Sequence, residues 1–468
     1  MLPRRLLTSA LVTASMACAR NAAPIHDFVK VDGPVIALTH ARVIDGTGAA
    51  GRANQTIVLR DGHIAAVGDA ATVSLPSNAR SLDLEGRTVM PGYVMVHEHL
   101  FFSPDGDGET SMRVSFPPLY LAGGATTIRT AGSRGLSADV ELQRSIDNRE
   151  TPGPNLALTS LYLDGAGLLS WPFETPEARG RRVAMKWADG GATSFKAYEH
   201  MTRAELTGVI AAAHERHLQV TGHLCAVTMA EAAHLGIDNL EHGIWVATDF
   251  VADKQPDVCP PSDVALTSVL AAPHWKIESL IQKLVAHRVA ITSTLPVFET
   301  FLPGREPAPP EALDLMATKA RARYVTHREE LAAQPPTSVW GDLLRKEMAF
   351  ELAFARAGGL LVAGTDPTGH GGIVAGFSNQ REIMLLVEAG FTPVEAIRIA
   401  SLNGARLLGR DGEIGSITHG KKADLVVVRG NPEDLISDIA HVEIVFKDGI
   451  GYDPDKLRAS VKGLVGYQ

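Results

Sequence analysis

Between residues 91 and 410 the chain alternates short apolar segments with helical segments, and this alternation constrains the fold more than any other feature. Such a pattern is typical of parallel strands joined by helices. The strand-like segments number eight: VMPGYVMVHEH, ATTIRTAG, NLALTSLYLDG, TSFKAY, QVTGHL, NLEHG, VAITSTLPV and LLVAGTDP. Because eight βα units close into a barrel, we predict an α/β fold with a (β/α)8 TIM barrel over residues 91–410. An open doubly wound sheet is the competing fold, but the first strand lacks the glycine fingerprint of a dinucleotide site.

The two ends of the chain have a different pattern. Segments such as TIVLRDGHIAAVGD near the N-terminus and HVEIVFKDG near the C-terminus are apolar runs that break at Asp-Gly or Gly-Asp pairs. These pairs are typical of the turns that join antiparallel strands. We therefore predict a small β-sandwich module built from both chain ends, residues 24–90 and residues 411–468.

Residues 1–19 have the order of a secretory signal peptide. Two arginines precede an apolar stretch that begins at Leu6, and small residues flank Cys18. This stretch is too short to span a membrane, and the small residues fit a cleavage site. We expect a periplasmic or secreted protein. A lipoprotein anchored through Cys18 is the alternative.

Composition narrows the classes of partner. The 468 residues are 45% hydrophobic and 21% charged, which is typical of a globular protein, and the net charge of −9 argues against nucleic acid. No second long apolar segment predicts a membrane span. Cys225 and Cys259 are the two cysteines left once the signal peptide is removed. They permit one disulfide in an oxidising compartment, although the sequence does not show whether they pair. A homo-oligomer stays open as well.

The first strand carries two histidines with a single residue between them. Side chains alternate along a strand, so His97 and His99 face one side and Glu98 faces the other. Two neutral imidazoles on one face suit a divalent metal, although a single buried histidine is usually a core residue. In a barrel the chemistry lies at the C-terminal ends of the strands. The other strand ends contribute Lys196, His223, His242 and Asp366.

Lys196 is the unusual member of this set, because an ammonium group is repelled by metal ions and is costly to bury. One interpretation is that it pairs with an acidic neighbour or extends to solvent. The other is that burial near cations makes the amine neutral, so that it takes up carbon dioxide and becomes a carbamate. A carbamate can bridge two metals. With Asp366 and a bridging hydroxide it leaves a positive site that polarises a carbonyl group.

Six segments, VMPGYVMVHEH, GATTIRTAG, TSFKAY, VTGHL, NLEHG and AGTDP, together resemble the amidohydrolase superfamily. Within it they resemble the branch with imidazolonepropionase-like and prolidase-like members, and the resemblance extends to the terminal GEIGSITHGKKADLVVV. It implies a distorted (β/α)8 barrel that binds one or two divalent metals, commonly zinc. It also implies a role for each position: His97 and His99 bind the more buried metal, carboxylated Lys196 bridges both, His223 and His242 bind the second, and Asp366 binds the first and moves the proton.

The predicted function is a binuclear metal-dependent amidohydrolase. A metal-bridging hydroxide attacks a carbonyl or amidine carbon, and Asp366 takes the proton and returns it to the leaving nitrogen. The substrate is a small molecule with a linear or cyclic amide bond. A dipeptidase or an N-acyl amino acid hydrolase is one such enzyme, and lactams and aromatic amides stay open as substrates. Three further residues are predicted substrate contacts, each with an alternative. Tyr198 can instead pack in the core, Arg129 can form a structural salt bridge, and His370 can simply turn a glycine-rich loop.

Two other functions stay open. A mononuclear cyclic-amide hydrolase or deaminase on the same barrel has no use for a bridging carbamate at Lys196. A non-enzymatic secreted binding protein is a third reading, but a decayed site loses ligands, and all six positions here are filled.

Overall fold

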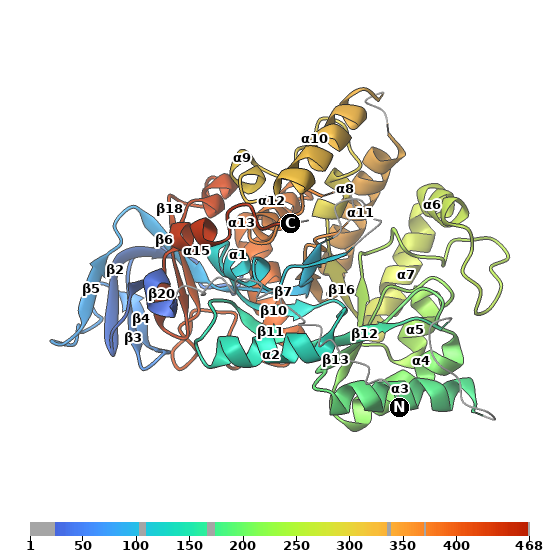
Figure 1. The fold of residues 1–468 in the computed structure, drawn as a ribbon, viewed down its shortest axis with the longest axis horizontal. Coiled ribbons are helices and arrows are strands. Elements are labelled where there is room, and N and C mark those ends of the chain that lie inside the picture. Colours follow the sequence, from blue (N-terminus) through green and yellow to red (C-terminus); the bar gives the residue numbers. More distant parts are fainter. Residues whose placement is uncertain (1–23, 103–108, 166–173, 335–337, 369–370, 467–468) are drawn as a thin grey trace, which may run out of the picture.

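The structure, a computed structural model, describes residues 24–102, 109–165, 174–334, 338–368 and 371–466. The predicted signal peptide, with Cys18, lies outside these ranges. Figure 1 shows a strand-rich part that contains both the blue and the red segments, next to a larger part in which helices surround shorter strands. None of the helices in the described part of the chain is both long enough and apolar enough to cross a bilayer.

All eight predicted strand segments of the central region form strands that pair in parallel. They are short, and nearly every residue in them is buried, as expected for strands covered on both faces. The strands are β7 (Tyr93–Glu98), β10 (Ala125–Thr130), β11 (Asn155–Ala157), β12 (Thr159–Leu163), β13 (Ser194–Ala197), β14 (Gln219–Gly222), β15 (Asn239–Glu241), β16 (Ala290–Ser293) and β17 (Leu361–Ala363).

The predicted closed barrel is not formed by the strand ladders of the described residues. The third predicted strand is divided at Leu158, so that β11 belongs to a three-stranded sheet, β11-β10-β7, and β12 begins a six-stranded sheet that ends at β17. Strands β17 and β7 share no ladder. Instead, the backbone N–H groups of Thr365 and Asp366 both donate to the carbonyl of His97, at 3.0 and 3.1 Å. Asp366 has a φ of 47°, so the chain has left the strand conformation where a closing ladder would run.

Helices alternate with these strands as the sequence predicts. Three of them, α4, α5 and α13, begin with a capping box in which a threonine and a glutamate three residues later satisfy the free N–H groups. The helices that follow or precede these strands include α2 (Leu136–Asp147), α3 (Pro176–Asp189), α4 (Arg203–Glu215), α5 (Met229–Leu235), α7 (His274–Ala286), α11 (Val339–Arg356), α12 (Phe377–Glu388) and α13 (Pro393–Arg398). Helix α13 continues through a π-helical turn into α14 (Gly404–Leu407). Further helices are α1 (Phe116–Ala122), α6 (Ser262–Ala271), α8 (Pro296–Glu299), α9 (Pro310–Leu313), α10 (Thr318–Ala332) and α15 (Pro454–Ser460).

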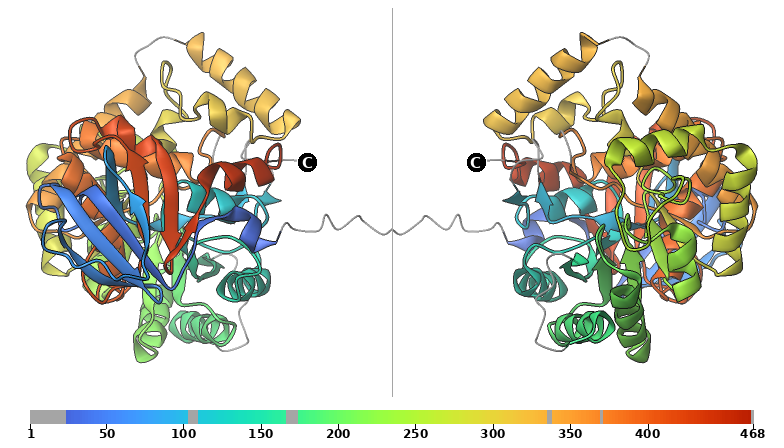
Figure 2. Two further views of the ribbon diagram at one scale, coloured as in Figure 1. Left: turned by 90° about the vertical axis from the view of Figure 1, so that its left-hand side faces the viewer. Right: turned by 90° about the vertical axis from the view of Figure 1, so that its right-hand side faces the viewer.

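The terminal segments combine in one nine-stranded sheet rather than in the two separate sheets of the predicted sandwich. The sheet curves around its own apolar cluster, which includes Ile36 and Leu38 from the N-terminal segment and Val427 and Phe446 from the C-terminal segment. Figure 2 shows the blue and red strands side by side. Its strands are β1 (Val29–Val31), β2 (Val35–Val43), β3 (Arg52–Arg60), β4 (His63–Asp69), β5 (Arg80–Asp83), β6 (Arg87–Pro91), β18 (Leu425–Arg429), β19 (Val442–Lys447) and β20 (Ile450–Tyr452).

Both chain ends contribute strands to this sheet, since β6 pairs with β18 and β1 pairs with β20. The exact domain boundaries given above stay predictions.

Candidate metal centre

All six residues predicted as metal ligands lie at or just beyond the C-terminal ends of parallel strands. His97 is the second-last residue of β7, and His99 directly follows this strand, while Lys196 is in β13. The remaining three come directly after a strand, or a few residues later: His223 after β14, His242 after β15 and Asp366 after β17. Because neighbouring parallel strands end at the same edge, the fold gathers these residues on one side.

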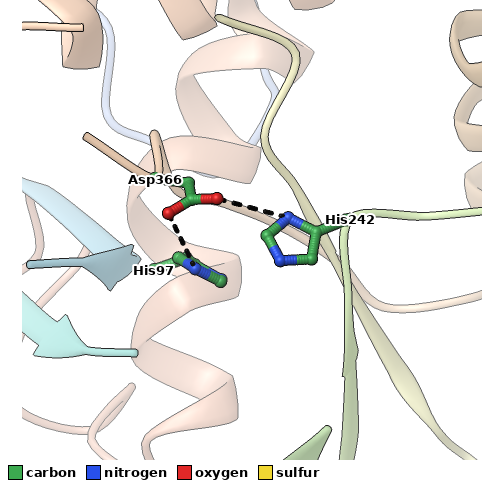
Figure 3. Close-up of side chains that lie close together, drawn as sticks. All are labelled: His97, His242 and Asp366. Carbon is green, nitrogen blue, oxygen red and sulfur yellow. Dashed lines mark ion pairs between the residues drawn. The ribbon is translucent and has the colours of Figure 1, made fainter. Parts of the chain in front are cut away.

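The carboxylate of Asp366 lies among three imidazoles. Figure 3 shows two of them, those of His97 and His242. The Oδ1 atom of Asp366 is 2.9 Å from Nε2 of His99 and 3.6 Å from Nε2 of His97, and its Oδ2 is 3.9 Å from Nδ1 of His242. One ligand atom each from His97, His242 and Asp366 can be chosen so that all three lie within 4.8 Å of one another. The left-handed backbone of Asp366, together with the hydrogen bonds from the N–H groups of Thr365 and Asp366 to the carbonyl of His97, places the carboxylate next to these imidazoles. These residues are close enough to share one metal ion.

Two further predicted residues lie next to this group rather than within it. The His223 ring is centred 4.7 Å from the His242 ring, and its Nε2 is 3.6 Å from Oε1 of Glu199. The Lys196 side chain is 1% exposed, and its Nζ is 3.8 Å from Oε1 of Glu241. The structure thus pairs Lys196 with an acidic neighbour, one of the two interpretations of this lysine. Its carboxylation stays a prediction.

Three of the imidazoles, those of His99, His223 and His242, are held in the neutral form that binds metals. Burial lowers the pKa of His99 to about 4 and that of His223 to about 3, and it lowers the pKa of His242 well below its usual range. Burial also lowers the pKa of Lys196, against the attraction of Glu241 and Asp366. For Asp366, burial alone raises the pKa, but the neighbouring imidazoles, His97 first, outweigh it and keep the group ionised.

The donor set fits a divalent ion such as zinc. Neutral imidazoles and a carboxylate are its usual nitrogen and oxygen ligands. In addition, Nδ1 of His99 is buried and has no hydrogen-bond partner among the described residues. A buried polar atom without a partner is uncommon and calls for an explanation, which coordination or a bound water would supply.

Glu241 is a functional residue that the sequence analysis did not select. It precedes His242 directly, and its Oε2 accepts a hydrogen bond from Nδ1 of His97 at 2.7 Å. Its Oε1 accepts from Arg129 at 3.0 Å and also from the hydroxyl of Thr221. The only signal in the sequence is its place in the NLEHG segment, one residue before a predicted ligand. Glu98, in contrast, points to the opposite face as predicted, where Asn379 donates to it at 2.8 Å.

The three residues predicted to contact the substrate differ in their surroundings. Arg129 is only 1% exposed, and it donates to the carbonyl of Val96 at 2.8 Å as well as to Glu241. The salt bridge of the alternative interpretation is therefore present, and the substrate contact of Arg129 stays a prediction. Tyr198 is half-buried, and its ring lies 5.0 Å from the ring of His223, so its substrate contact stays a prediction. His370 lies outside the described residues.

Aromatic rings border the imidazoles on two sides. The ring of Phe101 stacks on His99 at 4.4 Å, and the ring of Tyr162 is 5.0 Å from that of Tyr198. On the other side Trp245 lies 6.1 Å from His242. Such walls exclude water and strengthen electrostatic interactions within the site.

A disulfide joins Cys225 to Cys259, so the two cysteines that remain after the signal peptide do pair. Cys225 is two residues after His223, and the closed loop contains both Glu241 and His242. The crosslink therefore encloses the segment that supplies one face of the candidate centre.

Comparisons with known proteins identify the family of this chain. The model of the amidohydrolase family matches residues 88–450. An imidazolonepropionase from Salinispora arenicola is 24% identical over 409 residues, covering 85% of this chain and 90% of that protein, and one from Mycolicibacterium smegmatis is 25% identical over 408 residues, covering 84% and 87%.

Solved structures show the same fold. A Xaa-Pro dipeptidase with bound methionine in the active site has a TM-score of 0.65 and 19% identity, with 90% of this chain and all of that chain covered. The ochratoxinase of A. niger has a TM-score of 0.62 and 17% identity, covering 90% and 96%. Because the family model spans well over half of the sequence and includes every candidate ligand, this chain belongs to the amidohydrolase family.

Proposed function

We propose that this protein is a metal-dependent hydrolase that cleaves carbon–nitrogen bonds in small amides, with dipeptides and N-acyl amino acids as the substrates to test first. The observation that carries the proposal is the position of the Asp366 carboxylate, between 2.9 and 3.9 Å from nitrogens of His97, His99 and His242. Divalent ions, most simply zinc, held by these residues would polarise the substrate carbonyl and make water acidic enough to attack at neutral pH.

Asp366 is suited to move the proton in this reaction. It is ionised, 14% exposed and fixed by its backbone and by the Thr368 hydroxyl, which donates to Oδ1 at 3.1 Å. Its carboxylate can therefore accept a proton from the attacking water and return it to the leaving nitrogen. Tyr198 directly follows β13, and its hydroxyl would orient the substrate by a hydrogen bond. No serine or cysteine nucleophile is needed.

We infer two metal ions, with Lys196 carboxylated and shared between them. The burial of Lys196 at 1% exposure supports this, because a neutral amine is needed for carboxylation. His223 and His242, with ring centres 4.7 Å apart, would serve the second ion.

A mononuclear cyclic-amide hydrolase or deaminase is the second candidate, and specific observations favour it. The group of histidine and carboxylate ligand atoms that lie within 4.8 Å of one another contains His97, His242 and Asp366 but not His223. Lys196 already has Glu241 as an acidic partner. The imidazolonepropionases among the relatives, by their names, act on a cyclic compound.

The disulfide supports the proposed location of the protein. Structural disulfides persist in oxidising compartments, which agrees with export to the periplasm or the medium through residues 1–19.

Metal analysis and a substrate screen test these proposals. Purified protein should contain about two zinc ions per chain if Lys196 bridges them and about one if it does not. The zinc-loaded protein should hydrolyse members of a panel of dipeptides, N-acyl amino acids and cyclic amides, and the D366N variant should be at least 10²-fold slower on the same substrate.

The K196A variant separates the two candidates. In a binuclear enzyme it loses metal and activity, and short carboxylic acids restore part of the activity. Full turnover by K196A would rule out the bridge, and a preparation without metal or hydrolysis would refute the hydrolase proposal.

A further inference from the structure

We propose that Glu241 is a positioning residue that fixes the tautomer of His97, and that Arg129 holds Glu241 in place for this purpose. The inference deepens the proposed function, because it rests on His97 being a metal ligand. It assigns to two buried residues a role that they exert through His97.

The geometry selects one tautomer of His97. An ionised carboxylate can only accept hydrogen bonds, so the 2.7 Å contact between Glu241 Oε2 and His97 Nδ1 requires the proton on Nδ1. The Nε2 lone pair of His97 then lies on the side of Asp366, whose Oδ1 is 3.6 Å away. The Nδ1 partner of His242 is a neutral hydroxyl, that of Thr294 at 2.8 Å. The carboxylate therefore holds His97 more firmly than Thr294 holds His242.

Arg129 makes a buried carboxylate tolerable at this point. The side chains of Glu241 and Arg129 are 0% and 1% exposed, and a buried anion without a partner would be strongly destabilising. Arg129 also spans the site: its Nε donates to Val96 in β7, and its Nη2 donates to Asn239 in β15 at 2.7 Å. It thereby ties the strand that carries His97 to the strand that carries Glu241.

An amide at position 241 should reverse the tautomer. The oxygen of the new side chain would stay with Arg129, because a guanidinium group can only donate. The amide NH₂ would then face Nδ1 of His97 and donate to it, which moves the imidazole proton to Nε2. In this tautomer the lone pair of His97 is on Nδ1 and faces residue 241 instead of the metal, although the glutamine keeps nearly the size and position of Glu241.

The experiment measures zinc affinity by competition with a chelating dye in the full-length mature protein. E241Q should bind zinc 10- to 100-fold more weakly than wild type. E98Q is the matched control: Glu98 is equally buried and next to the same histidines, but it bonds to Thr365 and Asn379, and an amide can satisfy both. We expect E98Q to stay within about twofold of wild type. Circular dichroism checks the fold of each variant.

The pH dependence separates a tautomer effect from a general loss of structure. Because the wrong tautomer is neutral, the weaker binding of E241Q should persist from pH 6.5 to 8.5, whereas a merely protonated histidine would recover at the upper end. If E241Q does not fold, R129K provides the second test, since it keeps the charge but loses the planar fork and should also weaken zinc binding. Zinc affinity within twofold of wild type in a folded E241Q or R129K variant would overturn the inference. Wild-type protein that binds no zinc would overturn the proposed function as well.

Discussion

Removal of the Cys225–Cys259 crosslink is a perturbation whose magnitude follows from the structure. The disulfide closes a loop of 34 residues, and in the chain-entropy model a loop of this length stabilises the folded state by about 3.8 kcal/mol at 25 °C. The double variant C225S/C259S should lose free energy of unfolding up to this amount, because its unfolded chain is no longer constrained. The folded geometry should change little, since His223, Glu241 and His242 are also held by strands β14 and β15.

Urea unfolding followed by tryptophan fluorescence measures this loss, with and without a reducing agent. The reducing agent should shift the wild-type midpoint towards that of the double variant and should have no effect on the double variant itself, which serves as the internal control. Hydrogen exchange of the segment between the two cysteines should accelerate more than exchange in the nine-stranded sheet. Identical midpoints for the oxidised wild type and the double variant would refute the reasoning, because the loop would then contribute no stability.

Three other substitutions test separate parts of the description. G364A places a Cβ 2.3 Å from Cβ of His97, so it should destabilise the protein by about 1–3 kcal/mol and weaken zinc binding; unchanged urea unfolding and affinity would contradict this packing. Burial raises the pKa of Glu382 to about 8, so the folded state holds a proton that the unfolded state releases near pH 4.5, and stability should fall as the pH rises between these values. E382Q should flatten that decline in thermal unfolding, and an identical slope would exclude Glu382 as its source. Y198F should lower kcat/KM about tenfold through loss of one hydrogen bond to the substrate, and an unchanged value would assign Tyr198 to packing.

The order of strands and helices was predictable because each parallel strand is covered on both faces and therefore consists of a short run of apolar residues. Closure of the barrel was not predictable in the same way. It depends on how the last strand meets the first, and here Asp366 adopts a left-handed backbone and turns its N–H group to His97 instead of extending β17. Hydrophobic periodicity contains no information on such a local turn. The division of the third strand at Leu158 is of the same kind.

The candidate site was predictable where the rule about strand ends applies. It placed His97, His99 and Asp366 together, and Asp366 does contact both histidines. The sequence did not reveal the partners behind the site. The sequence around Arg129 does not show whether its side chain binds a substrate or a buried carboxylate. The contact between Glu241 and His97 is known only from the three-dimensional positions of β15 and β7.

The pairing of β6 with β18 and of β1 with β20 has a consequence for how the chain matures. Strand β6 leads directly into β7, which carries His97. One of its edges pairs with the earlier β2, but the other pairs with β18, which is made more than 300 residues later. During synthesis the nascent chain therefore keeps an open sheet edge until residues 425–452 emerge, and contacts this distant in sequence form slowly. An exposed edge invites pairing with other chains, so a polypeptide cut short before β18 should aggregate rather than accumulate as a folded intermediate.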